Sequence, residues 1–399
     1  MAPIDTSLLF TGTLNERALP AAPRRQVGLY DTTLRDGEQT VGVVFAPEEK
    51  LEIARLLDAL GVERIEAGFP RVSEEDWRAV KLIVGAGLGA EIWGFSRALV
   101  DDVQAVTDLG LRYTVIEAPV SDLKMRALGL SRETVLTRIE QAVSFATKQG
   151  IRVAFFGVDG SRADPDFLER TYRTAVDHGA VELVVVDTVG IASPEAAGYL
   201  VSQVRGWFDE QMPIHFHGHN DFGVATAAAL SAVRAGASWI HGTVDGMGER
   251  AGNADLAQVA LALGALYGVE TNLHLDRVRK LSSYVRSLTG HTLEPWKAVV
   301  GDNLFVRETG AVVAQFHIPE AIEPYSSTLL ATQRRVVLGK KSGLASIRLK
   351  CEELGLVVSQ DAQPELLAEV KQVALRKRGL LTDEEFRDLA DSVTARAQP

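Results

Sequence analysis

Eight short, β-rich apolar runs alternate with amphipathic helical stretches between residues 26 and 270, and this alternation constrains the fold more than any other feature. The expected strands are Val27–Tyr30, Arg64–Ala67, Ile92–Phe95, Tyr113–Glu117, Arg152–Phe156, Leu183–Asp187, Ile214–His217 and Ser238–Gly242. A helical pattern follows every run, which is typical of parallel strands joined by crossover helices. Eight such units predict an α/β fold, the (β/α)₈ or TIM barrel. A doubly wound sheet with fewer strands is the competing interpretation.

The helical stretches carry recognisable start signals. The clearest stretches are Pro47–Leu60, Arg132–Gln149, Asp164–His178 and Pro194–Phe208. Ser131 and Ser193 precede two of them and are the expected N-caps, because a serine oxygen can accept hydrogen bonds from the free N–H groups of a first turn. No Gly-x-Gly-x-x-Gly motif follows the first expected strand, so nothing supports nucleotide binding of the Rossmann type.

Two further segments flank the expected barrel. The span 26–270 is close to the roughly 250 residues that such a barrel needs. Residues 1–25 show little pattern and are expected to form a flexible N-terminal arm. After Thr271 the alternation stops, and residues 271–399 are expected to form a mostly helical C-terminal lid and dimerisation region.

Charge and cysteine content exclude several classes of protein. The chain carries 42 basic and 53 acidic residues, a net charge of −11, which disfavours binding to phosphate backbones, so no nucleic-acid partner is expected. Cys351 is the single cysteine, which excludes an internal disulfide framework, a cysteine-rich zinc site and a four-cysteine iron–sulfur cluster. No apolar run approaches about 18 residues and the start shows no secretory signal, so we expect a cytoplasmic protein without membrane contact.

Polar residues gather where several expected strands end. His217 and His219 follow the seventh strand two positions apart, and such residues point to the same side of an extended backbone. Asp36 follows the first strand and Asn253 the eighth, and these strands become near neighbours when a barrel closes. The four side chains are therefore expected to converge as metal ligands, with Arg35 supplying a fixed positive charge. Imidazole, carboxylate and amide ligands together suit Mg²⁺, Mn²⁺, Co²⁺ or Zn²⁺.

Each of these residues also has a purely structural interpretation. Asp36 could cap its own loop through backbone N–H groups. Arg35 could form a surface ion pair, and Asn253 could cap the following helix. His215 and His241 are expected to be structural residues and not ligands. Taken together, these structural interpretations are less convincing than a metal site, because four suitable ligands fall at one end of one expected barrel.

Five motifs in the chain resemble, in the same order, the signatures of the 2-isopropylmalate/homocitrate synthase family, which belongs to the DRE-TIM metallolyases. They are Asp31–Gln39, Ile65–Pro70, Asp187–Gly190, His217–Asp221 and Gly248–Asn253. The resemblance extends more loosely into the C-terminal region. Gly37–Ala46 and Ser161–Phe167 resemble most closely the homocitrate synthases of nitrogen fixation, whereas Ile65–Pro70 is more similar to isopropylmalate synthase.

The resemblance implies a metal-dependent, Claisen-type condensation of acetyl-CoA with a 2-oxo acid that gives a 2-substituted malate. The chain would then be an acyltransferase in which Arg35 stabilises charge at the keto oxygen and Thr188 bonds the substrate carboxylate. Glu66, Arg71 and Arg97 would contact the same substrate. Enzymes of this family commonly exchange their lids between two subunits, which implies a homodimer with an exchanged lid.

The chain departs from the family where the family handles protons. The usual lid motif His-Glu-Ser-Gly-Ile-His corresponds to Arg307–Val312, so both histidines are missing. Val158 stands where the family has a glutamate, and Lys124 stands where it has a histidine. Valine cannot take up a proton, so another group must do so. His317 is the expected catalytic group, with Glu117 or a water on the metal as alternatives.

Three functions therefore remain open. The first is a condensing synthase for an unusual, anionic 2-oxo acid, since Arg71, Arg97 and Lys124 would add positive charge near the expected pocket. The second is a metal-dependent aldolase or lyase on the same scaffold, acting without CoA. The third is a catalytically weak paralogue kept for binding or assembly, because function must be argued from the site and not from the fold.

Overall fold

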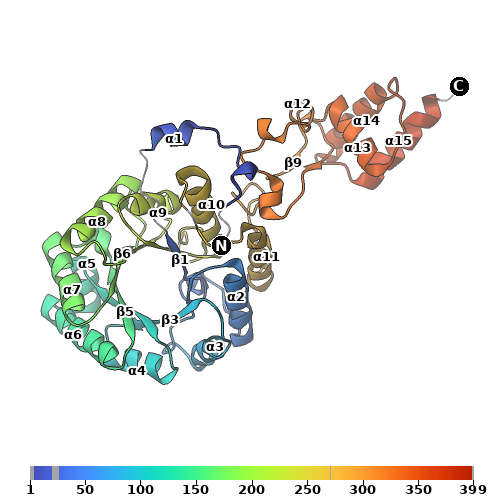
Figure 1. Cartoon of the computed structure of the whole chain (residues 1–399). Helices are drawn as coiled ribbons and strands as arrows, with labels where there is room; N and C mark the ends of the chain where they lie inside the picture. The colour runs from blue at the N-terminus through green and yellow to red at the C-terminus, as the bar shows by residue number, and fades with distance from the viewer. Residues whose placement is uncertain (1–3, 20–26, 270, 398–399) are drawn as a thin grey trace. The chain divides into compact units, whose positions relative to one another are not determined.

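Eight parallel strands close into a barrel in the computed structural model, which describes residues 4–19, 27–269 and 271–397 (Figure 1). The strands are β1 (Gly28–Asp31), β2 (Arg64–Glu66), β3 (Glu91–Arg97), β4 (Tyr113–Pro119), β5 (Arg152–Val158), β6 (Glu182–Asp187), β7 (Ile214–Gly218) and β8 (Trp239–Gly242). Strand β1 pairs with β2 on one side and with β8 on the other, so the sheet has no edge. This closure confirms the predicted TIM barrel and excludes the doubly wound sheet.

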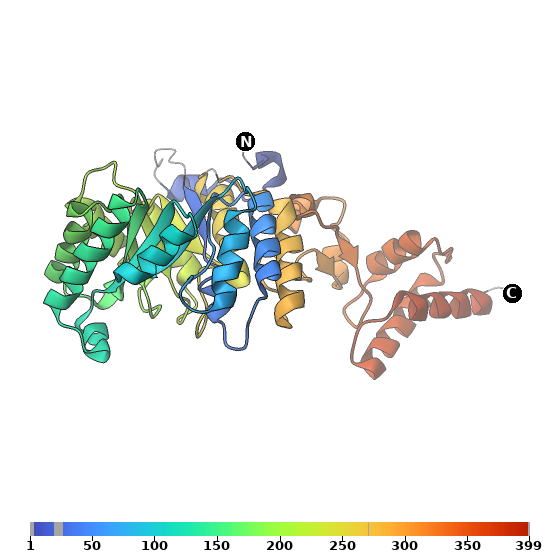
Figure 2. The same cartoon turned by 90° about the horizontal axis from the view of Figure 1, so that it is seen from below.

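A helix follows each strand, and two follow β4. These helices are α2 (Pro47–Leu60), α3 (Glu74–Val84), α4 (Val100–Asp108), α5 (Asp122–Leu128), α6 (Arg132–Lys148), α7 (Pro165–Asp177), α8 (Pro194–Trp207), α9 (Ala225–Arg234) and α10 (Leu256–Tyr267). Figure 2 shows the outer helices running alongside the strands. Within the described ranges, no helix has both the length and the apolar character that a membrane crossing requires.

The predicted helix starts are present. The Ser131 hydroxyl accepts a hydrogen bond from the backbone N–H of Thr134, at 3.1 Å, and caps α6. The Ser193 hydroxyl accepts one from the backbone N–H of Ala196, at 3.2 Å, and caps α8. Both bonds satisfy donors that the first turn of a helix leaves free, so the expected N-caps are confirmed.

The barrel interior is apolar at mid-height and polar towards the amino ends of the strands. Tyr30, Trp93, Phe95, Val115, Ala154, Phe156, Val184 and Val186 form the apolar cluster. His215 contacts Glu182 through Nε2, at 2.7 Å, and His241 through Nδ1, at 3.0 Å. Burial lowers the pKa of both histidines, so they are neutral interior residues bonded to one another. The interior network agrees with the expectation that His215 and His241 are structural.

The described residues form two compact units, and their division differs from the expected domain boundary. The barrel unit comprises residues 13–292, with 4 and 5, whereas the expected barrel ended at 270. The added part includes η5 (Leu275–Arg277) and α11 (Val278–Thr289), which packs against α2. Leu281 and Val285 on α11 are buried, so the helix supplies apolar cover that the β/α alternation alone did not reveal.

Part of the expected N-terminal arm is ordered. Residues 4–19 include η1 (Thr6–Leu8) and α1 (Leu14–Ala18), and Leu9 forms an antiparallel bridge with Tyr325. The backbone N–H of Phe10 donates to the carbonyl of Pro324, at 2.9 Å. Residues 6–12 therefore belong to the second unit and do not form the expected flexible arm, because they pair with the backbone of that unit. Residues 1–3 and 20–25 of that arm lie outside the described residues.

The second unit has its own apolar core. It contains residues 293–397 and 6–12, with a two-stranded parallel sheet formed by β9 (Val306–Arg307) and β10 (Arg335–Val336). Its helical elements are α12 (Gly310–Val313), η6 (Pro319–Ala321), η7 (Ser327–Leu330), α13 (Leu344–Leu354), α14 (Gln363–Lys377) and α15 (Asp383–Ala397). Ile347, Cys351 and Phe386 are buried in its apolar cluster, so the single cysteine is a core residue.

Candidate metal centre and active site

Asp36, His217 and His219 form a compact, buried cluster of potential metal ligands. Asp36 Oδ2 lies 3.1 Å from His217 Nε2 and 3.6 Å from His219 Nε2. One ligand atom from each residue lies within 4.8 Å of the others. The predicted convergence of these three residues is therefore present, and they are the ligand types that suit a first-row divalent metal.

The loop after β1 positions Asp36. The carbonyl of Thr32 accepts hydrogen bonds from the backbone N–H groups of Arg35, Asp36 and Gly37, at 3.1, 2.8 and 3.0 Å. These bonds fold the loop back at the end of β1 and place Asp36 beside β7. The Asp36 side chain makes no capping hydrogen bond to the short helix η2 (Gly37–Gln39) that follows it. Its carboxylate is therefore available to the cluster, and the capping interpretation is wrong.

The histidine pair is arranged for metal binding. His219 Nδ1 lies 3.2 Å from the carbonyl oxygen of Gly252, which favours a proton on Nδ1 and leaves the lone pair of Nε2 facing Asp36. Burial lowers the pKa of His219 to about 4, and the neighbouring His217 adds to this effect. A neutral imidazole is the form that ligates a metal.

The charge on Asp36 is strongly favoured even though the residue is buried. Burial opposes ionisation, but Arg35, His217 and His219 together outweigh it and hold the pKa of the Asp36 carboxyl well below its usual range. Asp36 Oδ1 is buried and has no hydrogen-bond partner among the residues that the structure describes. A buried carboxylate oxygen without a partner is costly unless a ligand meets it, so the donor set fits a divalent cation.

Arg35 is a buried interior residue and not a surface ion pair. Its Nη1 lies 3.1 Å from Asp36 Oδ2, and its Nε donates to Glu66 Oε2 at 2.5 Å. The guanidinium also lies over the ring of Phe95, with 4.3 Å between its carbon and the ring centroid. Arg35 Nη2 has no partner in the described part of the chain. The structure therefore leaves one guanidinium nitrogen able to donate to a bound molecule.

Glu66 positions Arg35, and its expected contact with substrate stays a prediction. It is fully buried, and its second oxygen accepts a hydrogen bond from the Tyr30 hydroxyl at 3.1 Å. Both carboxylate oxygens are thus engaged by protein groups. Tyr30 was not among the expected site residues, because alternation shows that it faces the barrel interior but not which side chain it meets there.

Asn253, the fourth expected ligand, lies beside the cluster. It is buried, and its backbone forms a bridge with His219. Its side-chain nitrogen donates to the carbonyl of Met247 at 2.9 Å. A Cβ at Gly248 would overlap that nitrogen, so the loop requires glycine there. Asp255 and not Asn253 caps α10, so the capping interpretation of Asn253 is wrong.

Thr188 lies just after β6, where its hydroxyl oxygen accepts a hydrogen bond from the backbone N–H of Asp159 at 2.7 Å. The hydroxyl proton therefore remains to be donated elsewhere. The Asp159 carboxylate accepts hydrogen bonds from Ser121 and Arg162 and so joins the loops after β4 and β5. This network presents Thr188 at the carboxyl end of the barrel, as its expected role requires.

Arg71 and Arg97 share one carboxylate. Arg97 donates to Asp102 through Nε and Nη2, at 2.7 and 3.1 Å, and Arg71 Nε lies 3.8 Å from the same group. The two arginine side chains are about half exposed, at 51% and 49%, whereas Asp102 is buried. Two guanidinium groups facing one carboxylate leave net positive charge at this side of the barrel.

His317 lies in the second unit, with an exposed side chain. The structure brings Asp36, His217, His219, Asn253, Arg35 and Glu66 together within the barrel unit, and the catalytic role expected of His317 stays a prediction. Arg250 forms an ion pair with its neighbour Glu249, at 3.6 Å. Its guanidinium binds Asp221 at 2.8 and 3.1 Å and the carbonyl of Thr188 at 2.8 Å, and so joins the loops after β6, β7 and β8.

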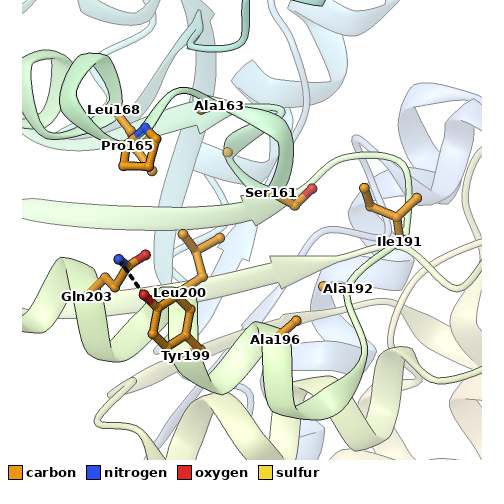
Figure 3. Close-up of a pocket in the computed structure, with 11 residues that line it drawn as sticks. Ser161, Ala163, Pro165, Leu168, Ile191, Ala192, Ala196, Tyr199, Leu200 and Gln203 are labelled. Atoms are coloured by element: carbon orange, nitrogen blue, oxygen red, sulfur yellow. Dashed lines mark hydrogen bonds between the residues drawn. The ribbon is translucent and has the colours of Figure 1, made fainter.

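A separate cavity of about 280 Å³ opens beside the loops after β5 and β6 (Figure 3). Leu168, Ile191 and Leu200 make its lining largely apolar. Ser161 at one end donates to Asp187 at 2.7 Å, and Gln203 donates to Tyr199 at 3.0 Å. None of the cluster residues lines this cavity, so the cavity is separate from the candidate metal ligands.

Comparisons with known proteins agree with this geometry. A family model described as HMGL-like matches residues 26–285. Homocitrate synthase AksA of Methanopyrus kandleri is 43% identical over 370 residues, which cover 92% of each chain. A probable 2-isopropylmalate synthase of the same organism is 41% identical over 353 residues, covering 87% of this chain and 70% of the relative.

A solved structure shows the same barrel. HMG-CoA lyase of Bacillus subtilis superposes with a TM-score of 0.62 at 19% identity, covering 68% of this chain and 96% of the lyase. At that identity the likeness concerns the fold alone, whereas the sequence relatives cover most of the chain. The chain thus belongs to the HMGL-like family and is an acyltransferase-type enzyme similar to homocitrate and 2-isopropylmalate synthases.

Proposed function

We propose that this enzyme condenses acetyl-CoA with a 2-oxo acid to form a 2-substituted malate and free CoA. The observation that carries the proposal is the buried cluster of Asp36, His217 and His219 beside Arg35. The two sequence relatives described above are named as synthases of homocitrate and 2-isopropylmalate, and both products are 2-substituted malates.

The cluster supplies the electrophilic half of the reaction. Asp36, His217, His219 and Asn253 would hold a divalent ion, which supplies Lewis-acid polarisation of the keto group. Arg35 Nη2 is the nitrogen without a protein partner, and it donates to the keto oxygen as negative charge develops there. Glu66 holds Arg35 in place, because its carboxylate accepts a hydrogen bond from Arg35 Nε and leaves Nη2 available to the substrate.

The substrate carboxylate is bound by Thr188. Its oxygen already accepts the N–H of Asp159, so its proton points to another acceptor, and a carboxylate is a strong one. Arg250 does not bind the substrate carboxylate, because its guanidinium is already bound to Asp221. Thr188 therefore orients the substrate through the carboxylate that all 2-oxo acids have in common.

The 2-oxo acid carries a second anionic group. Arg71 and Arg97 provide net positive charge around Asp102, at the ends of β2 and β3. We expect Arg97→Gln to raise KM for a 2-oxo dicarboxylate at least tenfold and to change KM for a branched monocarboxylate little. Equal effects on both substrates would contradict an anionic distal group. Arg173→Gln on the outer face of α7 is the matched control.

A lyase reaction would use the same metal cluster, but the sequence relatives support condensation. The relatives named as synthases are about 40% identical over most of the chain, whereas the lyase structure is 19% identical.

We also propose that residues 293–397 act as a lid exchanged between the two subunits of a homodimer. The family resemblance supports this proposal, and subunit mass tests it.

The proposed reaction is tested by CoA release. The purified enzyme is given acetyl-CoA, a divalent metal and each of a panel of 2-oxo acids, and free thiol is measured. We expect thiol release with at least one 2-oxo acid and none without it. A protein that cleaves a 2-substituted malate or another hydroxy acid without CoA, and releases no thiol with any 2-oxo acid, contradicts the proposal.

A further inference from the structure

One carboxylate on the inner face of the barrel is not committed to a protein partner. Glu117 lies on β4, and Tyr113 and Val115, which precede it at alternate positions, pack in the interior cluster. Alternate residues of a strand share a face, so Glu117 also points inward, at the carboxyl end of the strand. In the strand register it lies between Arg97 of β3 and Phe156 of β5.

The other carboxylates near Arg35 each have at least one protein partner. Asp36 contacts Arg35 and both histidines, and Glu66 accepts hydrogen bonds from Tyr30 and Arg35. The carboxylate of Glu117 accepts no hydrogen bond and forms no ion pair with any residue in the described ranges. Its side chain is only partly buried, so a molecule in the barrel mouth can reach it.

The surroundings of Glu117 allow it to gain and lose a proton near neutrality. Burial raises the pKa of Glu117 to about 7, and the negative charge of Glu66 acts in the same direction. Arg35, Arg97 and Lys124 oppose this rise from the β1 loop, from β3 and from α5. The facing residues of β5 are apolar. A general base works best when its pKa lies close to the working pH.

We infer that Glu117 is the general base of the condensation, an inference that rests on the proposed function. The Glu117 carboxylate removes a proton from the methyl group of acetyl-CoA. The C–H electron pair forms the enolate double bond, and the thioester carbonyl pair moves to its oxygen. The enolate carbon then bonds to the keto carbon, whose π pair moves to the keto oxygen. That oxygen takes the proton back from Glu117, so the carboxylate is restored, and water then hydrolyses the thioester.

A base on β4 would replace the two titratable residues that the resembled family has where this chain has valine. Val158 on β5 and Val312 in the second unit carry no titratable group. Glu117 lies on β4, which is next to β5 in the barrel. The two strands pair up to Val158. The base therefore lies on the barrel itself, in the same unit as the metal cluster.

The test measures kcat/KM for CoA release between pH 5.5 and 9 in the wild type and in Glu117→Gln, Glu117→Asp, His317→Ala and Asp122→Asn. We expect Glu117→Gln to lower kcat/KM about 10²–10⁴-fold and to remove the fall in rate below about pH 7. Glu117→Asp should keep that limb with part of the rate. Asp122→Asn, an exposed carboxylate five residues away, is the matched control and should resemble the wild type, whereas His317→Ala tests the rival base and should keep the acidic limb.

Two further readouts separate a base from a structural residue. Glu117→Gln should bind metal and 2-oxo acid as the wild type does, and methyl-deuterated acetyl-CoA should give a larger isotope effect. If Glu117→Gln keeps its rate within threefold, or if His317→Ala loses the acidic limb instead, the inference is overturned while the proposed function stands. A wild type that releases no CoA with any 2-oxo acid overturns both.

Discussion

At the scale of single residues, Arg35 joins the metal cluster to the barrel interior. It contacts Asp36 on one side and Glu66 on the other, and Glu66 is in turn held by Tyr30. This chain of bonds fixes where the guanidinium can donate, because buried groups with all partners engaged have few alternative positions. Residues that support a ligand or a charge in this way often affect turnover without touching the substrate.

Tyr30→Phe tests this chain of bonds. We expect turnover to fall about 10–100-fold with unchanged metal content, because Glu66 loses one of its two donors. Tyr172→Phe is the matched control, since its buried hydroxyl donates to the Val184 carbonyl at 2.8 Å, away from the cluster. Both variants should lose about 1 kcal/mol of stability. Equal losses of turnover in the two variants would contradict a special role for Tyr30.

The sequence predicted which residues could be ligands better than it predicted what surrounds them. His217, His219 and Asp36 were placed from strand ends and spacing, which a barrel brings together in a known way. The contacts of Glu66 with Arg35 and Tyr30 were not predicted, because period-two alternation gives the face of a strand but not its partner across the barrel. Arg250 pairs with its sequence neighbour Glu249, but its closer partner Asp221 lies in a loop whose path the sequence does not reveal.

At the scale of elements, all eight predicted strands are present, and the predicted bounds differ from those observed by a few residues. Their apolar runs are short and strongly patterned, so the local sequence is enough to place them. The end of the barrel unit was placed too early. Helix α11 lies beyond the last β/α unit, and its membership depends on packing against α2, which periodicity alone cannot show.

Leu281→Ala tests the assignment of α11 to the barrel unit. Leu281 is buried on this helix, so its truncation should destabilise the enzyme by about 2–5 kcal/mol. Lys280→Ala, the neighbouring exposed position, should change stability by no more than about 0.5 kcal/mol. Denaturant unfolding of both variants gives the two values. A loss below about 1 kcal/mol for Leu281→Ala would mean that α11 contributes little to the barrel unit.

At the scale of the whole molecule, an acidic chain carries local positive charge where anions are expected to bind. The net charge is −11, yet Arg35, Arg71, Arg97 and Lys124 all lie at or near the carboxyl ends of the strands. Local charge and not net charge governs the binding of small ions in a cleft. The candidate metal ligands and these cations lie at the same end of the barrel.

The proposed exchange of lids predicts a stable dimer. Light scattering or sedimentation should give twice the 43.2 kDa mass of one chain. Mixing an Asp36→Asn chain with a chain altered only in residues 293–397 should restore part of the activity, because an exchanged lid gives some mixed dimers one intact site. A monomer with full activity would contradict the exchange.

Metal dependence of CoA release, compared between the wild type and Asp36→Asn, tests the central claim most directly. The enzyme is stripped with a chelator, divalent metal is returned in steps, and bound metal and thiol release are measured on the same samples. The wild type should bind one ion per cluster and regain activity in proportion, whereas Asp36→Asn should bind little metal and release no CoA. An Asp36→Asn enzyme that keeps both metal and turnover would contradict the site described here.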